Sequence, residues 1–481
     1  MGGIAMPLHD DEMNRRREKR EAQQKKRQAE AKRMKRTLFL AVLVLIGCGF
    51  GIYKLTQKPP AEVGEAMVQE TEAVKETSRP TTPIEKDPIT TIHIKAAGDL
   101  NVTDLVVNSG LSVSGFDYSP VFKDVAAILA DADLTVMNFE GNVCGEPYGT
   151  ETSSAPQQLL EGLRACGVDL LQMANSCTIN NGLNGLTSTL NAIRAAGMEP
   201  LGAYASDAEF RNSKGYTITE VLGVKVAFVA FTKGLGGRGM PAGNENLVNL
   251  LYTDYAEAYK KLDEEGITAI LKNVAAEKPD ITIAMLHWGS EYNDEISSSQ
   301  NKLVSLMQKQ GVDVIVGTHP HTVRPIVFDK AAGTLVAYSL GDFFGDAKRG
   351  GTNYSIILDL EITKDANAGT TKVTDYTISP IYTVKEGECI GNEDHRILRI
   401  EQAIEANTEN FLDKVTDTTK ANMEYALQRI DERIATTIEG ICPECEKEVE
   451  ILVNKYGKLV TNSTCQCGNV LEAGSDMSDY D

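Results

Sequence analysis

The sequence predicts an α/β domain that begins near residue 90. From that point, short apolar runs alternate with amphipathic stretches of helical length. This alternation is typical of strands and helices that build a mainly parallel sheet, and the shorter connections among the later strands indicate an antiparallel portion. We expect strands at 91–97, 133–138, 168–173, 224–231, 281–286, 313–316, 334–339 and 354–361, and helices at 119–131, 156–166, 184–196, 253–277 and 296–310.

Charge is distributed unevenly along the 481 residues, a length that allows two or three domains. Residues 1–36 carry twelve Lys and Arg against six Asp and Glu, so this segment is +6. Since the whole chain is −20, the remainder is −26. Nucleic-acid binding is supplied by clustered Lys and Arg, so the acidic bulk argues against a nucleic-acid partner.

An uncharged run from Leu38 to Tyr53 lies between Arg36 and Lys54. At about 1.5 Å per residue, it is close to the shortest helix that crosses a membrane. The basic block before it predicts that residues 1–36 are cytoplasmic and that everything after Lys54 is outside. Two alternatives stay open: a cleaved signal peptide, and a lipoprotein processed at Cys48 of a lipobox-like sequence.

The chain can therefore be divided in order. We expect a basic cytoplasmic segment at 1–36, a transmembrane signal anchor at 37–53, an extracytoplasmic linker at 54–89, the main domain at 90–390, a helical segment at 391–440, a zinc-ribbon-like module at 441–472 and an acidic tail at 473–481. This organisation predicts a single-pass protein of the cell membrane whose main domain is extracytoplasmic.

Histidines and carboxylates stand where the predicted strands end. His287 follows the strand at 281–286, and His319 and His321 follow the next one, while Asp99 and Glu140 close the first two strands. Each residue alone has a structural explanation, as a cap, a surface charge or a packed imidazole. Loops at strand ends can direct side chains to one point, so together they predict a divalent metal site. A mixed nitrogen and oxygen donor set suits Mn, Fe or Zn rather than Ca.

Four cysteines form two close pairs near the C-terminus. Cys442 and Cys445 enclose Pro-Glu, and nineteen residues later Cys465 and Cys467 enclose one Gln. Two thiolate pairs separated by a hairpin predict a structural zinc ribbon. A regular ribbon has two residues between the cysteines of its second pair, and outside the membrane disulfides are the rival interpretation.

Six motifs in order carry a family resemblance over residues 91–347. They are Gly98-Asp99, Asn138-Phe139-Glu140, Met173-Ala174-Asn175, His287-Trp288-Gly289-Ser290-Glu291-Tyr292, Gly317-Thr318-His319-Pro320-His321 and Tyr338-Ser339-Leu340-Gly341-Asp342-Phe343. With them the chain resembles the CapA-type poly-γ-glutamate capsule synthesis proteins, a branch of the calcineurin-like metallophosphoesterase superfamily. The resemblance implies a four-layer αββα sandwich with a metal site at the sheet edges, on a membrane-tethered extracytoplasmic domain.

The resemblance also assigns roles. It implies that Asn175, Trp288, Glu291 and Tyr292 line the substrate path or orient His287, with core packing as the alternative for the single tryptophan. The candidates for direct catalysis are His287 and Cys177.

One stretch departs from the family motif. The family usually reads Ala-Asn-Asn-His followed shortly by Asp-Tyr-Gly, where this chain has Ala174-Asn175-Ser176-Cys177 and then Asn180-Asn181-Gly182. In the wider superfamily the positions of Ser176 and Cys177 are a metal ligand and the residue that helps the leaving group depart. Serine is a poor metal ligand, and a thiol is a weaker or different acid.

Two functions follow from the resemblance. The first is a membrane-anchored metal-dependent hydrolase of capsule or poly-γ-glutamate assembly, acting on a phosphoester or a γ-amide. The second is a catalytically weakened polymer-binding or scaffold component of a capsule synthesis or export complex. Both imply a membrane, an anionic polymer such as poly-γ-glutamate, and membrane synthase or export subunits as partners.

Overall fold

The computed structural model describes residues 88–390, 395–409, 414–455 and 457–475, all within one unit that spans 85–481. The predicted cytoplasmic segment and membrane anchor lie outside these residues, as do nearly all of the predicted linker and most of the acidic tail. Among the described residues, no helix combines the length and the apolar character needed to cross a membrane.

The first sheet is parallel at one end and antiparallel at the other, as predicted. Its order is β16-β15-β14-β1-β4-β5-β6, and β13 pairs with the end of β1. Strands β1, β4, β5 and β6 are parallel, whereas β14, β15 and β16 are antiparallel. The bounds are β1 Ile89–Asn101, β4 Leu134–Glu140, β5 Leu170–Gln172, β6 Glu199–Leu201, β13 Asp342–Phe344, β14 Tyr354–Asp365, β15 Thr370–Val384 and β16 Arg396–Arg399.

The second sheet has the order β11-β12-β10-β9-β8-β7. Its four inner strands are parallel, and its two edge strands are antiparallel to their neighbours. The bounds are β7 Thr217–Val221, β8 Val224–Thr232, β9 Ile281–His287, β10 Val314–Thr318, β11 Ile326–Asp329 and β12 Thr334–Ala337.

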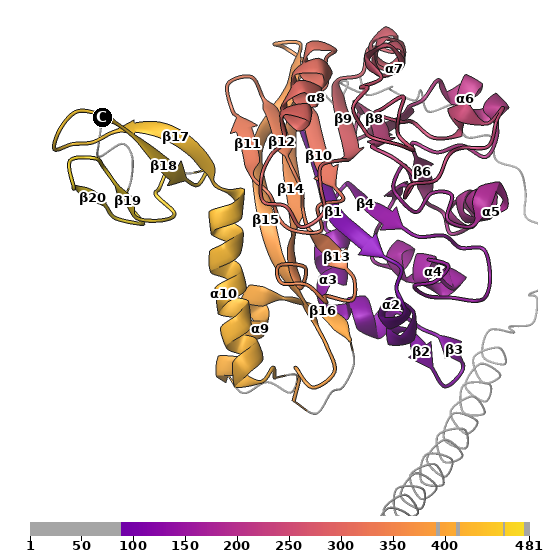
Figure 1. The fold of residues 1–481 in the computed structure, drawn as a ribbon, viewed down its shortest axis with the longest axis horizontal. Helices are drawn as coiled ribbons and strands as arrows, with labels where there is room; N and C mark the ends of the chain where they lie inside the picture. Colours follow the sequence, from indigo (N-terminus) through magenta and orange to yellow (C-terminus); the bar gives the residue numbers. More distant parts are fainter. Residues whose placement is uncertain (1–87, 391–394, 410–413, 456, 476–481) are drawn as a thin grey trace, which may run out of the picture. The chain divides into compact units, whose positions relative to one another are not determined.

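Alternating side chains show that the sheets face each other. On β8, Phe228 and Ala230 belong to the main core that also contains Ile94 of β1, whereas Val229 and Phe231 pack in a separate cluster with α7 (Glu264–Ala276) and α8 (Ser298–Lys309). Successive residues of a strand point to opposite faces, so the second sheet lies between the first sheet and these two helices (Figure 1).

The opposite face of the first sheet carries α3 (Ser119–Ala130). Lys95 of β1 donates to the carbonyls of Ile128 and Asp131 at 2.8 and 2.5 Å, and Thr135 of β4 donates to Leu129 at 2.8 Å. Helices α4 (Gln157–Ala165) and α5 (Gly182–Ala195) contribute to the same core. The described domain is thus a mixed α/β fold in which helices enclose two layered sheets.

The remaining elements are short or C-terminal. They are α2 Asp104–Ser109, β2 Leu111–Ser112, β3 Gly115–Phe116, α6 Asp207–Ser213, the 3₁₀-helix η1 Glu245–Leu247, α9 Ile400–Glu409, α10 Asp417–Ile434, β17 Thr436–Ile441, β18 Glu448–Val453, β19 Ser463–Thr464 and β20 Val470–Leu471.

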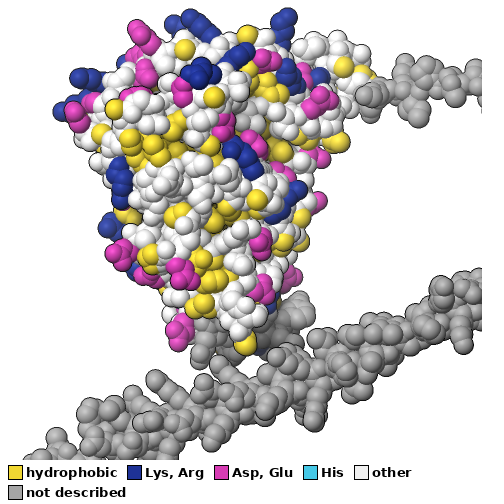
Figure 2. Space-filling model, turned by 90° about the vertical axis from the view of Figure 1, so that its right-hand side faces the viewer, with side chains coloured by type: hydrophobic (Ala, Val, Ile, Leu, Met, Phe, Trp, Pro, Cys, Tyr) yellow, Lys and Arg dark blue, Asp and Glu magenta, His cyan; other side chains and the backbone are white. Residues whose placement is uncertain are grey.

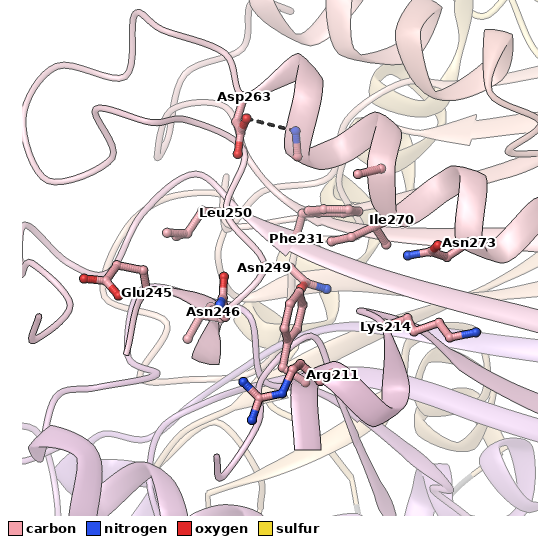
Figure 3. A pocket seen from close by; sticks show the side chains of 14 residues that line it. Arg211, Lys214, Phe231, Glu245, Asn246, Asn249, Leu250, Asp263, Ile270 and Asn273 are labelled. Carbon is pink, nitrogen blue, oxygen red and sulfur yellow. Dashed lines mark hydrogen bonds between the residues drawn. The ribbon is translucent and has the colours of Figure 1, made fainter. Parts of the chain in front are cut away.

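The helix predicted at 253–277 is too long. Only residues 264–276 are helical, because Asp254 accepts hydrogen bonds from the backbone N–H groups of Lys260 and Lys261 at 2.9–3.0 Å and closes a turn. Asp263 then caps α7 by accepting from Gly266 at 3.0 Å (Figure 3). Such local side-chain bonds give the backbone an alternative to helix.

The predicted helical segment at 391–440 is also wrong at both ends. Residues 396–399 form β16, which pairs with β15 and extends the first sheet past residue 390. Residues 436–441 form β17, which pairs with β18. In both places pairing with another strand decides the local structure, and the pattern within the segment itself does not reveal that pairing.

Candidate metal centre at the strand ends

The five predicted metal-site residues come together. Asp99 and Glu140 lie at the carboxyl ends of β1 and β4 in one sheet, and His287, His319 and His321 lie at or just beyond the ends of β9 and β10 in the other. All five are at least nine-tenths buried. Because the sheets face each other, donors that are far apart in sequence meet at one edge.

One group consists of Glu140, His287 and His319, whose donor atoms lie within 4.8 Å of one another. The two imidazole centroids are 4.4 Å apart, and His287 Nε2 is 3.3 Å from Glu140 Oε1. Three buried atoms here, Glu140 Oε2, His287 Nε2 and His319 Nδ1, have no hydrogen-bond partner among the described residues. Leaving three such atoms uncompensated is costly, so this group fits a bound cation.

A second group consists of Asp99, Glu140 and His321, again within 4.8 Å. Glu140 belongs to both groups, so its carboxylate would help to hold an ion at either one. Asp99 accepts hydrogen bonds from the His319 backbone N–H at 3.0 Å and from Asn138 Nδ2 at 2.6 Å. These bonds fix the carboxylate while leaving further lone pairs for a ligand.

Neighbouring groups orient the imidazoles. Thr232 Oγ1 lies 3.2 Å from His287 Nδ1, so the other ring nitrogen, Nε2, is free for the site. His319 and His321 have φ of 93° and 60°. Positive φ is uncommon and strained for residues other than glycine, and such strain gathers at functional sites. The turn therefore holds both rings toward the carboxylates at some cost in backbone energy.

Burial governs the carboxyl groups of the site. It raises the pKa of Asp99 to about 8, and it also raises the pKa of Asp342. Burial acts in the same direction on Glu140, but the neighbouring imidazoles, that of His287 first, lower its pKa. A buried cluster of carboxyl groups needs positive charge nearby, which protons or a metal ion supply.

The imidazoles next to the carboxylates differ in their protonation. Burial, reinforced by His287, lowers the pKa of His319 well below its usual value. Burial acts the same way on His321, but Asp342 and Asp99 raise its pKa well above the usual value. His319 is thus neutral and ready to ligate, whereas His321 must release a proton first.

Asp342 was missed as a site residue. It starts β13, which pairs with β1 so that Asp342 stands opposite Asp99, and its Oδ1 lies 2.8 Å from His321 Nδ1. Asn101 donates to the same oxygen at 2.8 Å. The sequence did contain a pattern that points to Asp342, because Gly341-Asp342 repeats the pair Gly98-Asp99.

The two departures from the family motif lie beside the first group. The Ser176 hydroxyl donates to the Glu140 carboxylate. The Cys177 sulfur lies 3.8 Å from the hydroxyls of Ser176 and Ser153, and burial raises the pKa of this thiol to about 12. At neutral pH the thiol stays protonated and is a poor proton donor.

The residues expected on the substrate path divide into two pairs. Glu291 and Tyr292 line a pocket of about 450 Å³ that includes Glu140 and His321. Trp288 instead packs in the outer core, stacked on Tyr338 with centroids 5.5 Å apart, so the packing alternative describes its placement.

Asn175 is fully buried and donates to Asn138 Oδ1 at 3.0 Å and to the carbonyl of Phe139 at 2.7 Å. It supports the strand end rather than lining the pocket.

Basic side chains stand at the mouth of this pocket. Arg349 lies over the Tyr292 ring, 4.1 Å from its centroid, and Lys348 lines the same pocket. The Tyr292 ring stacks in turn on His321 at 5.4 Å. The Tyr292 ring thus lies between the Arg349 guanidinium and the buried imidazole of His321.

Other surfaces of the domain are different in character. A second pocket of about 410 Å³, lined by residues of α6, η1 and α7, contains none of the predicted site residues (Figure 3). On the face drawn in Figure 2, Lys and Arg are interspersed with Asp and Glu.

The described domain is thus a layered α/β fold that gathers carboxylates and imidazoles at its strand ends. Residues 93–347 match the family described as "Bacterial capsule synthesis protein PGA_cap". The match covers more than half of the 481 residues, so the chain belongs to this family, as its motifs predicted.

Individual relatives are more distant. The chain is 27% identical over 253 residues to the PGA biosynthesis protein CapA of Bacillus subtilis, covering 51% of this chain and 62% of that protein. It is 27% identical over 244 residues to the capsule biosynthesis protein CapA of Bacillus anthracis, covering 48% and 54%. The match thus spans less than two thirds of either relative. A solved calcineurin-like phosphoesterase, YfkN of Bacillus subtilis, aligns at 17% identity with a TM-score of 0.39, covering 71% of this chain and 98% of that one.

Replacing Asp342 by Asn should weaken Mn²⁺ binding by roughly 10–100-fold, the usual effect of losing a carboxylate that orients a ligating imidazole. Isothermal titration calorimetry of the full chain in detergent measures this. The matched control is Glu220→Asn, at an exposed position on β7. Equal affinities for Asp342→Asn and the unmodified chain would remove Asp342 from the site.

Metal affinity should increase as the pH rises from about 6 to about 8, because protons on His321 and Asp99 compete with the ion. Both groups have raised pKa values, so the fraction already deprotonated grows across this interval. Mn²⁺ titrations in buffers of different ionisation enthalpy measure the proton release. An affinity independent of pH, with no proton released, contradicts this assignment.

Proposed function

We propose that this chain is a membrane-anchored protein of capsule or poly-γ-glutamate biosynthesis with a metal-dependent, phosphoesterase-like hydrolase site. One observation carries the hydrolase part: Glu140, His287 and His319 bring ligand atoms within 4.8 Å of one another, and each has a buried polar atom without a hydrogen-bond partner among the described residues. Membership of the capsule synthesis family supports the biological role.

The ion would be Mn, Fe or Zn, held by Asp99, Glu140, His287, His319 and His321. When bound, a divalent cation supplies Lewis acidity and a water nucleophile near neutral pH. The chain's own groups do the rest. Asp342 and Thr232 orient imidazoles, and Tyr292 with Arg349 borders the pocket where an anionic substrate would enter.

A second candidate function is a polymer-binding or scaffold component with weakened catalysis. Two features favour it: Ser176 stands where the resemblance implies a metal-ligating Asn in the wider superfamily, and burial raises the pKa of the Cys177 thiol to about 12. General acid catalysis is most efficient when the pKa lies near the working pH, so Cys177 would help a leaving group poorly. The pocket could still hold an anionic polymer.

The membrane attachment remains part of this proposal. It rests on the apolar run at 37–53 and its basic flank, with lipid attachment at Cys48 as the alternative. An extracytoplasmic domain on such an anchor would work beside membrane synthase or export subunits. The four C-terminal cysteines lie outside the stretch that matches the family, so a structural zinc ion there would have no part in hydrolysis.

The hydrolase and scaffold functions are separated by the full chain in detergent with Mn²⁺, assayed on a phosphodiester and for binding of poly-γ-glutamate. We expect turnover that falls at least about 100-fold in His319→Ala, because one ligand of the first group is lost. The Glu220→Asn chain is the control. Polymer binding without turnover in the unmodified chain would leave the scaffold function and exclude the hydrolase.

Replacing Cys177 by His should raise the rate of phosphodiester hydrolysis by roughly tenfold or more, since a positioned general acid contributes about 10²–10⁴-fold. The imidazole would bring a pKa near neutrality to the place of a thiol that holds its proton. The control is Cys177→Ala, which leaves the position without an acid. Equal rates for the His and Ala variants would show that this position does not serve the leaving group.

A further inference from the structure

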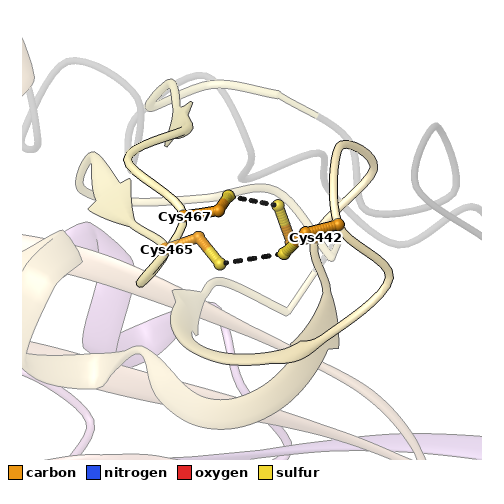
Figure 4. A group of neighbouring side chains, drawn as sticks. Cys442, Cys465 and Cys467 are labelled. Atoms are coloured by element: carbon orange, nitrogen blue, oxygen red, sulfur yellow. Dashed lines mark hydrogen bonds between the residues drawn. The ribbon is translucent and has the colours of Figure 1, made fainter.

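The four C-terminal cysteines meet at one point. They come from the turn after β17 and from the turn between β19 and β20, and their sulfur atoms all lie within 4.8 Å of one another (Figure 4). Cys442 Sγ is 3.7 Å from Cys467 Sγ, and Cys445 Sγ is 3.5 Å from Cys465 Sγ. The second pair therefore reaches the cluster although only one residue separates its cysteines.

We propose that these four thiolates bind a single Zn²⁺ ion and that this ion holds residues 436–475 folded. Zinc bonds to thiolate sulfur are about 2.3 Å long, so the edges of a regular ZnS₄ tetrahedron are roughly 3.8 Å. The two sulfur pairs match that edge and are far from the bonding distance of about 2.0 Å in a disulfide. The arrangement is thus that of a metal site, not of two oxidised pairs.

Backbone and side-chain donors complete the surroundings of the sulfurs. The Cys442 sulfur accepts hydrogen bonds from the backbone N–H groups of Glu444 and Cys445, and from Asn469 Nδ2 at 3.6 Å. The Cys445 sulfur accepts from the N–H of Lys447. Donors aimed at sulfur stabilise the thiolate form that a metal needs.

Glycine explains how the shorter second pair closes. Gly468 has φ of +91° and follows Cys467 directly, and its N–H donates to the carbonyl of Cys465 at 2.8 Å. A residue with a side chain would be strained in that conformation. The turn brings Cys467 back over Cys465, so both sulfurs face the first pair.

The hydrophobic core of this module is too small to hold it alone. It consists of Val449, Ile451, Val453, Leu459 and Leu471 packed with buried Cys442 and Cys465. Folded units of about 40 residues usually need disulfides, metals or a partner. Four protein ligands also leave no open position, so the ion would be structural.

Zinc loading is tested on the full chain purified in detergent without chelators. In a His319→Ala chain we expect one zinc ion, which is lost when Cys445→Ser or Cys467→Ser is added and kept when the matched control Cys144→Ser is added. Co²⁺ exchanged into the His319→Ala chain should give sulfur-to-metal charge-transfer bands and intense tetrahedral visible bands. The metal count in His319→Ala separates this site from the strand-end centre, so either proposal can fail without the other.

Hydrogen exchange tests the folding role without relying on variants. Amides of β17 and β18 should be protected with zinc bound and lose that protection when a chelator removes the ion, while β1 and β4 stay protected. Protection that persists after zinc is gone would overturn the folding role. A chain that carries no zinc and whose four cysteines resist alkylation until reduced would overturn the site itself.

Discussion

Glu140 is the carboxylate on which the candidate centre depends, because it belongs to two of the three donor groups at the strand ends. The third group consists of Glu291, His319 and His321. Glu140 is buried at the end of β4, where water cannot solvate its charge freely. Imidazoles from the opposite sheet balance that charge, and they lower its pKa against the effect of burial. The packing of the two sheets and the charge balance at their common edge therefore depend on each other. Separating the sheets would leave the Glu140 carboxylate without its imidazole partners.

The same constraint explains the unusual backbone between His319 and His321. Both residues have positive φ, a conformation that costs of order 1–3 kcal/mol each and persists only where the surroundings impose it. Here the His319 backbone N–H donates to Asp99, and the His321 ring pairs with Asp342. Contacts with carboxylates of the first sheet thus hold a loop of the second sheet in its strained form.

Much of this centre could be predicted from sequence because each donor follows an apolar run. An apolar run such as 281–286 predicts a strand by itself, and the residue that follows the run is then predicted to lie at the sheet edge. Asp342 could not be placed that way, since β13 has three residues and its position depends on pairing with β1. Trp288 departs from the predicted substrate path for a different reason. It directly follows His287 at the end of β9, but its side chain packs in the hydrophobic core and not at the site.

The limits of pattern reading elsewhere have the same origin. Residues 396–399 and 436–441 are strands because they pair with other strands, β15 for the first and the adjacent β18 for the second. Within the turn before α7, the competing bonds come from one carboxylate, that of Asp254. A single sequence records the propensity of each stretch but not the partner that overrides it.

For function, the central question is which parts of the candidate site remain when Ser176 and Cys177 replace the residues of the family motif. The metal-binding donors do not depend on either residue, since the free atoms belong to Glu140, His287 and His319. Ser176 instead donates to Glu140, which holds one of its oxygens and leaves the other free. The three atoms that lack partners are thus present with serine at position 176, whereas burial keeps the Cys177 thiol protonated. The two departures therefore bear on different parts of the chemistry: the donors of the candidate centre and the proton for a leaving group.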